Sequence, residues 1–338
     1  MDIEVASRGF DDRIRWDPAL IRKYDVAGPR YTSYPTALQF AEGFGSREYE
    51  QYLLERPPVI GPLSLYVHIP FCRNICYYCA CNKIVTRDAA VAERYIVALE
   101  KEIALLAHHH DQRRRVTQLH WGGGTPTFLS PSELTRLMHG LARHFSLIDA
   151  PEREYSIEID PRSVDTGTIA LLKGLGFNRI SMGIQDFDPQ VQRAINRIQP
   201  FDMVESLVDA VREHRFKSLS FDLIYGLPLQ SPASMEETLA KVLALNPDRV
   251  SCYSYAHLPD MFSSQRSIDR MQLPSADAKL EVLHTIIDTL TDAGYLYVGM
   301  DHFVKPEDEL AQALHDGTLQ RNFQGYSTQL APELIGIG

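Results

Sequence analysis

Residues 63–81 read LSLYVHIPFCRNICYYCAC, a short strand pattern that runs directly into a cysteine-rich loop. Aliphatic residues alternate with Tyr66 and His68 in the strand, so the two kinds of side chain lie on opposite faces. Three cysteines of the loop follow C-x3-C-x2-C spacing: Cys72, Cys76 and Cys79. Short spacing lets three thiolates converge on one site, and their softness suits an iron–sulfur cluster or zinc.

Zinc is the structural alternative for these thiols. A structural zinc site closes with four protein ligands, and Cys81 or His68 could supply the fourth. A four-iron cube held by three thiolates instead keeps one iron free of protein ligands. Because structural zinc loops seldom open a βα barrel at its mouth, the position after a first strand favours a 4Fe-4S cluster.

The rest of the chain alternates short β-branched or aromatic runs with helical patterns, which predicts βα units around a parallel sheet. We expect six strands and a weaker seventh at 64–69, 116–121, 155–160, 179–184, 219–224, 249–255 and 295–299. The helical patterns between them cover 92–107, 132–145, 168–175, 201–214, 234–245 and 276–293. Capping residues precede several of them, including Ser130 before Pro131 and Asp165 or Thr166 before the third pattern.

Several predicted strands have one polar face. Glu158, Asp160 and Asp222 alternate with aliphatic or aromatic residues, whereas a flat parallel sheet covered on both sides reads as continuously apolar. A polar face therefore predicts an α/β fold in which a partial (β/α)6 TIM-like barrel encloses a polar ligand. Its chemistry is expected at the C-terminal mouth of the strands.

Composition narrows the class of protein. The chain has 338 residues and a formal net charge of −10, which argues against nucleic-acid or anionic-membrane binding. Four of its five cysteines lie between Cys72 and Cys81, which favours a reducing compartment and a metal site over a disulfide framework. Cys252 is expected in the core. No apolar run has the length of a membrane helix or the form of a secretory signal, so we expect a soluble, cytoplasmic chain.

Three regions are expected along the chain. Residues 1–60 should form an N-terminal arm and a helix, 61–300 the partial barrel, and 301–338 the start of a C-terminal extension. The last four residues are apolar and uncapped, which suggests that the fold continues beyond them. His108, His109 and His110 end a helical pattern among Gln and Arg residues and are expected to be a solvated cap.

These motifs resemble the radical S-adenosylmethionine superfamily. The likeness rests on 66–72 (YVHIPFC), the three spaced cysteines and the aromatic Tyr78 before the third. Cys81 followed by Asn-Lys, and the stretches 30–36 (RYTSYPT), 299–302 (GMDH) and 321–326 (RNFQGY), make the chain similar to the oxygen-independent coproporphyrinogen III oxidase (dehydrogenase) family. This resemblance runs from about residue 17 to the last residue. It implies a barrel of the radical S-adenosylmethionine type.

The resemblance also implies cofactor positions. It places three residues at a first S-adenosylmethionine: Tyr66, Gly123 and Glu158. It places seven at a second: Tyr78, Gly124, Thr125, Gln185, Arg197, Asp222 and Ala256. Asp222 and Arg197 also suit this role chemically, because a carboxylate accepts from ribose hydroxyls and a guanidinium pairs with a carboxylate. The glycine run 121–127 (WGGGTPT) alone would most often be a tight turn, and no Gly-Lys-Ser/Thr of a phosphate loop follows it.

The reaction implied is decarboxylation of coproporphyrinogen III propionates to protoporphyrinogen IX by a 5′-deoxyadenosyl radical, in haem biosynthesis. Arg30, Tyr31 and Cys81 are implied near the tetrapyrrole, although Arg30 and Tyr31 could equally belong to a surface loop. His302 could lie near the substrate or serve a structural hydrogen bond. An electron donor, an electron acceptor and a monomeric state are expected. The alternatives are a haem-binding chaperone of the same superfamily and a zinc-stabilised barrel with an interaction role.

Two departures from the family stand out. Ala80 occupies a position that is usually glycine between the last two cysteines, and it restricts the backbone there. Family members also carry a further C-terminal domain that helps to close over the substrate, which this sequence does not include. We therefore expect the presentation of Cys81 and the cover of the substrate to differ from the family pattern.

Overall fold

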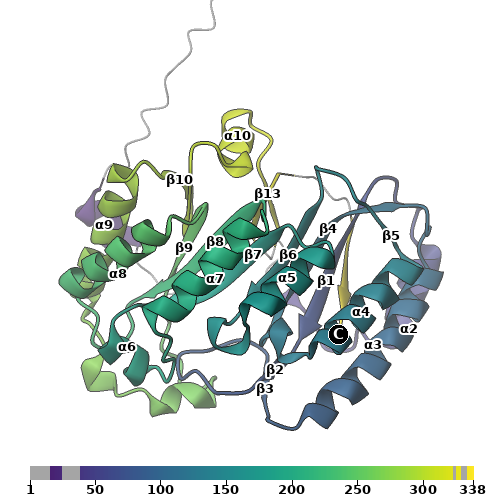
Figure 1. Cartoon of the computed structure of the whole chain (residues 1–338), viewed down its shortest axis with the longest axis horizontal. Coiled ribbons are helices and arrows are strands. Elements are labelled where there is room, and N and C mark those ends of the chain that lie inside the picture. The colour runs from purple at the N-terminus through teal and green to yellow at the C-terminus, as the bar shows by residue number, and fades with distance from the viewer. Residues whose placement is uncertain (1–15, 25–38, 323–324, 329–332) are drawn as a thin grey trace, which may run out of the picture.

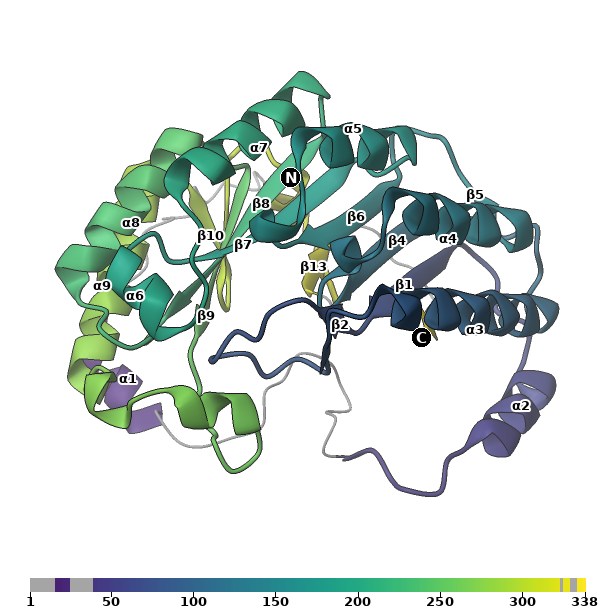
Figure 2. The same cartoon turned by 60° about the horizontal axis from the view of Figure 1, so that its bottom comes forward.

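The computed structural model describes residues 16–24, 39–322, 325–328 and 333–338. A curved sheet of ten strands forms its centre, and helices lie along the outer side of the curve (Figures 1 and 2). Six of the strands pair in parallel: β1 (Leu63–Ile69), β4 (Arg115–Gly123), β6 (Glu154–Ile159), β7 (Arg179–Gln185), β8 (Ser218–Tyr225) and β9 (Arg249–Ser254). All six were predicted from the sequence, and the expected α/β fold is confirmed.

Helices connect these strands on the outer side: α3 (Ala89–His108), α4 (Pro131–His144), α5 (Thr166–Gly174), α6 (Pro189–Ala194), α7 (Phe201–Glu213), α8 (Pro232–Leu245) and α9 (Ala276–Asp292). The six longer ones match the predicted helical patterns, whereas the short α6 was not predicted. Two further helices, α1 (Pro18–Tyr24) and α2 (Ser46–Glu55), precede the sheet. Among the described helices, none is both long and apolar enough to cross a membrane.

Local capping explains where the outer helices begin. The Ser130 side chain accepts a hydrogen bond from the Glu133 N–H, and Glu133 bonds back to Ser130, with Pro131 in the first turn. Asp165 accepts from the Thr168 N–H at the start of α5. Both starts agree with the capping residues predicted from the sequence.

Strand parity explains the core. In β6, Tyr155, Ile157 and Ile159 are buried under the helices, while Ser156 and Glu158 are half-buried on the inner face. Trp121 of β4 is fully buried and packs edge-on against Phe177, with 5.1 Å between ring centroids. The apolar faces therefore hold the helices to the sheet, and the polar faces line the concave side.

The last residues contribute strands at both edges of this sheet. Three strands are involved: β10 (Leu296–Gly299), β11 (His302–Val304) and β14 (Glu333–Ile337). β11 pairs antiparallel with β9 and β10, while β14 pairs in parallel with β1. The order β10-β11-β9-β8-β7-β6-β4-β1-β14 leaves β10 and β14 apart within the described chain, so the barrel is partial. Two strands within residues 301–338, β11 and β14, thus belong to the barrel sheet.

The amino end of β14 corrects the expectation for the histidine run. Glu333 accepts hydrogen bonds from Arg56 and Arg114, and His110 Nδ1 lies 3.5 Å from the same carboxylate. His108 is exposed, but His110 is buried. The solvated-cap interpretation is therefore wrong for His110, because Glu333, which is distant in sequence, and its two arginines surround the ring.

Candidate active site

The cysteine loop follows β1 and is closed at its base by two short parallel strands, β2 (Phe71–Cys72) and β3 (Ile84–Val85). Loop carbonyls accept hydrogen bonds from side chains both near and distant in sequence. Asn196 Nδ2 donates to Ile75 O at 2.7 Å, and Gln265 Nε2 donates to Tyr78 O at 2.9 Å. Ser264 Oγ and Lys83 Nζ both donate to Cys79 O. These bonds hold the loop over the carboxyl ends of the strands.

One cavity of about 270 Å³ joins this loop to the strand ends. Its lining includes all four loop cysteines: Cys72, Cys76, Cys79 and Cys81. It also includes eight of the predicted cofactor positions: Tyr78, Gly123, Gly124, Thr125, Glu158, Gln185, Arg197 and Asp222. The structure therefore brings together, at the expected mouth, residues that span more than a hundred positions of the sequence.

Two predicted cofactor residues do not line this cavity. Tyr66 stacks on His120, with ring centroids 5.8 Å apart, and its hydroxyl lies 2.9 Å from His68 Nδ1. Ala256 accepts a hydrogen bond through its carbonyl from Gln265 Nε2 at 3.2 Å, and the same amide holds Tyr78. The predicted substrate residues Arg30 and Tyr31 lie outside the described residues.

The donor set suits a four-iron cube. Around one tetrahedral zinc, thiolate sulfurs lie about 3.8 Å apart, and within the described ranges no three His, Cys, Asp or Glu side chains gather around a single metal ion. Three soft thiols that face one cavity suit the corners of a cube. The arrangement thus fits the cluster and disfavours the zinc alternative.

The loop thiols differ in acidity. A hydrogen bond from Cys81 lowers the pKa of Cys79 to about 6. Burial opposes this shift, and the charge of Lys83 adds to it. The same bond, together with burial, raises the pKa of Cys81. Burial also raises the pKa of Cys72, although Thr125 Oγ1 lies 3.5 Å from its sulfur. Cys79 is therefore the more acidic thiol of the Cys79–Cys81 pair.

Two arginines lie beside Cys76. Arg162 Nη2 is 3.2 Å from Cys76 Sγ, and Arg197 Nη1 is 3.5 Å from it. Both guanidiniums also bind Asp160, and they hold its pKa at about 2 although burial opposes the ionised form. Arg162 was missed in the sequence analysis, although its position directly after the end of a strand was a signal.

The glycine run packs tightly against the exit of β1. Gly123 has a φ of +120°, and a Cβ on it would lie 2.8 Å from the His68 ring. A Cβ on Gly124 would lie 2.6 Å from Pro70 O, and the Gly124 N–H donates to Ile69 O. The Gly123 N–H also points to Glu158 Oε2 at 3.3 Å. Glycine is therefore required here for close approach of two strand exits.

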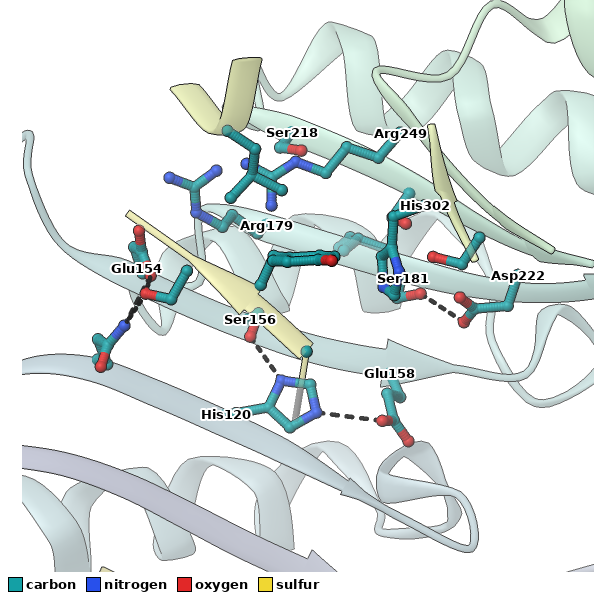
Figure 3. Close-up of a pocket in the computed structure, with 18 of the residues that line it drawn as sticks. His120, Glu154, Ser156, Glu158, Arg179, Ser181, Ser218, Asp222, Arg249 and His302 are labelled. Carbon is teal, nitrogen blue, oxygen red and sulfur yellow. Dashed lines mark hydrogen bonds and ion pairs between the residues drawn. The ribbon is translucent and has the colours of Figure 1, made fainter. Parts of the chain in front are cut away.

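Below the mouth, the barrel interior is polar, as strand parity predicted (Figure 3). His120 lies 2.6 Å from Ser156 Oγ and 3.1 Å from Glu158 Oε1. Ser181 donates to Asp222, whose pKa is raised to about 6 by burial. This inner cavity, about 180 Å³ in volume, shares three lining residues with the mouth cavity: Glu158, Asp222 and Tyr253.

His302 lines the inner cavity rather than the mouth. Its ring meets Tyr253 and Tyr326 edge-on, at centroid distances of 6.1 Å and 5.1 Å. Tyr326 belongs to β13 (Gly325–Ser327), which pairs with β12 (Gln320–Asn322). His302 therefore links the C-terminal hairpin to the barrel interior.

Comparison with known proteins agrees with this geometry. The family model of the radical SAM superfamily matches residues 66–242. The chain is 53% identical over 327 residues to the oxygen-independent coproporphyrinogen III oxidase of Pseudomonas aeruginosa, covering 97% of this chain and 71% of the relative. Identity to the Escherichia coli protein of that name is 50% over 330 residues, covering 96% and 70%.

A solved structure supports the same family relationship. Coproporphyrinogen III oxidase from Escherichia coli, described as a radical SAM enzyme, superposes with a TM-score of 0.89 at 50% identity. The match covers 96% of this chain and 72% of that structure. The likeness thus includes the barrel, the cysteine loop and the C-terminal strands, and the chain belongs to the oxygen-independent coproporphyrinogen III oxidase family of the radical SAM superfamily.

Proposed function

We propose that the chain catalyses the oxygen-independent oxidative decarboxylation of coproporphyrinogen III propionates to protoporphyrinogen IX, in haem biosynthesis. The observation that supports this most is the mouth cavity, where three thiols at C-x3-C-x2-C spacing meet the glycine run and the strand-end carboxylates. The relatives named as coproporphyrinogen III oxidases match over nearly the whole of this chain. Haem-binding chaperone activity is the alternative that the experiment below excludes or supports.

Cys72, Cys76 and Cys79 would hold a 4Fe-4S cluster, which supplies a one-electron path to S-adenosylmethionine and so a carbon radical. Tyr66, Gly123 and Glu158 would orient the first S-adenosylmethionine. In this role, Glu158 is held by His120 and by the Gly123 N–H. Each bond restricts the carboxylate to the inner face of β6.

A second S-adenosylmethionine would be held by seven residues: Tyr78, Gly124, Thr125, Gln185, Arg197, Asp222 and Ala256. Gln185 and Arg197 flank Gly183, whose missing side chain leaves their amide and guanidinium room. Asp222 accepts hydrogen bonds from Ser181 and Ser251 and would accept a further one from a ligand hydroxyl. The protein's part is binding, orientation and exclusion of water.

The tetrapyrrole would lie over the mouth, with Arg30 as an anchor for a propionate and Tyr31 and Cys81 beside it. A substrate that carries several carboxylates needs local cations in a chain with a net charge of −10. An external electron donor, an electron acceptor, a monomeric state and a cytoplasmic location complete the proposal.

The decisive experiment is anaerobic reconstitution followed by assay of 5′-deoxyadenosine and protoporphyrinogen IX with coproporphyrinogen III. The wild type should form both, and Cys76→Ala should form neither. Cys252→Ala is the matched control, because this buried cysteine lies in the core outside the loop, and it should retain both products. Stable haem binding without turnover would instead establish the chaperone.

The anchor role of Arg30 has its own test. Arg30→Ala should raise the KM for coproporphyrinogen III, because a propionate loses a charged partner, while the KM for S-adenosylmethionine stays the same. Unchanged KM and kcat for the tetrapyrrole would remove Arg30 from the substrate site.

A further inference from the structure

One loop cysteine differs from the others in the charge that it faces. Cys76 is buried, and its sulfur lies 3.2 Å from Arg162 Nη2 and 3.5 Å from Arg197 Nη1. The Cys72 sulfur has instead the neutral Thr125 hydroxyl within reach. Cys76 therefore has two guanidiniums in contact with its sulfur, whereas Cys79 has the single ammonium group of Lys83 nearby.

Asp160 does not cancel this charge. It is the carboxylate partner of both arginines, with Arg162 Nη2 at 2.7 Å and Arg197 Nη1 at 3.0 Å. Two guanidiniums and one carboxylate leave a net charge of about +1 next to Cys76, in a site where all three side chains are mostly buried. A charge in such surroundings acts on its neighbours far more strongly than it would in water.

The fork of Arg162 is fixed by its other partners. Nε and Nη2 bind the two oxygens of Asp160, and Nη1 donates to Asn196 O at 3.3 Å. The planar guanidinium therefore has one orientation, in which Nη2 also reaches the sulfur. Arg197 is less suited to this single role, because it also donates to Gly183 O and stands among the proposed cofactor positions.

We propose that Arg162 raises the reduction potential of the cluster by donating a hydrogen bond to Cys76 Sγ. Hydrogen bonds to cluster sulfurs and nearby positive charge both favour the more negative, reduced state. One electron enters from an external one-electron reductant, no bond forms or breaks, and no proton is needed, since the guanidinium is already charged. The inference rests on the proposed cluster and assigns Arg162 as a tuning residue that contacts a ligand.

The test is a redox titration of the reconstituted full chain, followed by the electron paramagnetic resonance signal of the reduced cluster without S-adenosylmethionine. Arg162→Gln should make reduction at least about tenfold less favourable, which is about 59 mV for one electron. Arg162→Lys keeps the charge but not the fork, so it should give a smaller downward shift. Iron and sulfide content are measured for each variant.

Arg73→Gln is the matched control. It removes the same formal charge, here from within the cysteine loop, but the Arg73 guanidinium lies over the Phe128 ring at 5.1 Å rather than on a sulfur. Its shift should be clearly smaller than that of Arg162→Gln.

Distinct outcomes separate the two proposals. Fully loaded Arg162→Gln with the wild-type potential would overturn the role of Arg162 and leave the cluster standing. If Arg162→Gln does not retain a cluster, an unchanged potential in loaded Arg162→Lys would overturn it equally. A wild-type chain that binds no iron and sulfide would instead contradict the proposed function itself.

Discussion

Asp160 and Glu333 are two largely buried carboxylates that each lie between two arginines, at opposite ends of the sheet's strands. Asp160 follows the carboxyl end of β6 and binds Arg162 and Arg197. Glu333 begins β14, opposite the first residue of β1, and binds Arg56 and Arg114. Their side chains are almost equally buried, with exposures of 13% and 10%. Burial and charge balance alone therefore do not distinguish the two sites.

The two sites differ in the further residue that lies against the arginines and the carboxylate. At Asp160 it is the sulfur of Cys76, so the surplus positive charge faces a thiol that can become an anionic ligand. At Glu333 it is His110, whose pKa is lowered mainly by burial. Arg114 also donates to Gly61 O and Pro62 O, directly before β1. Two arginines around one carboxylate thus lie against a proposed cluster ligand at Asp160, and hold an edge strand in place at Glu333.

Glu333→Gln should have the largest effect on folding. It leaves two buried guanidiniums without their carboxylate, which costs about 3–5 kcal/mol when a buried pair loses one member. The free energy of unfolding, measured by urea denaturation, should fall by that amount. The exposed Glu55→Gln should change it little, and an equal loss in both variants would contradict the comparison.

Asp160→Asn should cost less in stability, about 1–3 kcal/mol, as for a buried group that loses part of its hydrogen bonding. Arg162 and Arg197 keep acceptors at Asn196 O and Gly183 O. The variant should also retain less iron after reconstitution, because the arginines beside Cys76 lose their alignment. Iron retention equal to that of Glu333→Gln would show that the two carboxylates are equivalent after all.

The two sites should lose their contributions to the free energy of unfolding over different pH ranges. Burial lowers the pKa of His110 despite the opposing Glu333 charge, and Arg56, Arg114 and His109 act in the same direction as burial. The unfolded chain then binds this proton more tightly, so stability is lost as pH falls below about 6.5, with a slope of at most about 1.4 kcal/mol per pH unit.

Denaturation series at several pH values test this. His110→Gln should flatten the dependence of unfolding free energy between pH 7 and 5, and an unchanged slope would exclude His110 as its source. The carboxyl group of Asp160 has a depressed pKa of about 2. The stability that it contributes should persist down to about pH 4 and be lost only below that, as pH falls through the folded-state pKa.

Arg136→Ala should have the smallest effect. Arg136 reverses the arrangement, since one guanidinium binds two carboxylates, Glu93 and Glu100, on the helix surface. Exposed ion pairs are screened by water and salt and contribute little. The urea midpoint should stay within error of the wild type. A clear loss would show that charge pairing, rather than burial, sets the size of the effects above.

Much of the fold and part of the candidate site could be predicted from sequence because their signals are local. Alternation with a period of two placed Glu158 and Asp222 on the inner face of their strands. The spacing of Cys72, Cys76 and Cys79 lies within one loop, and Ser130 marks a helix start three residues from its partner. Such patterns need only the geometry of a strand, a loop or a helix turn.

The contacts that separate the two carboxylates were decided by the tertiary structure. Arg162 meets Cys76 across 86 positions of the sequence, and Glu333 meets Arg56 across 277. No local pattern specifies which strand ends meet, or that the last residues return to the edge of β1. An arginine affects a thiol or a carboxylate only when the two lie a few ångströms apart in space. The Asp160 site therefore gains its thiol neighbour, and the Glu333 site its edge strand, only once the sheet has curved and its strands have paired.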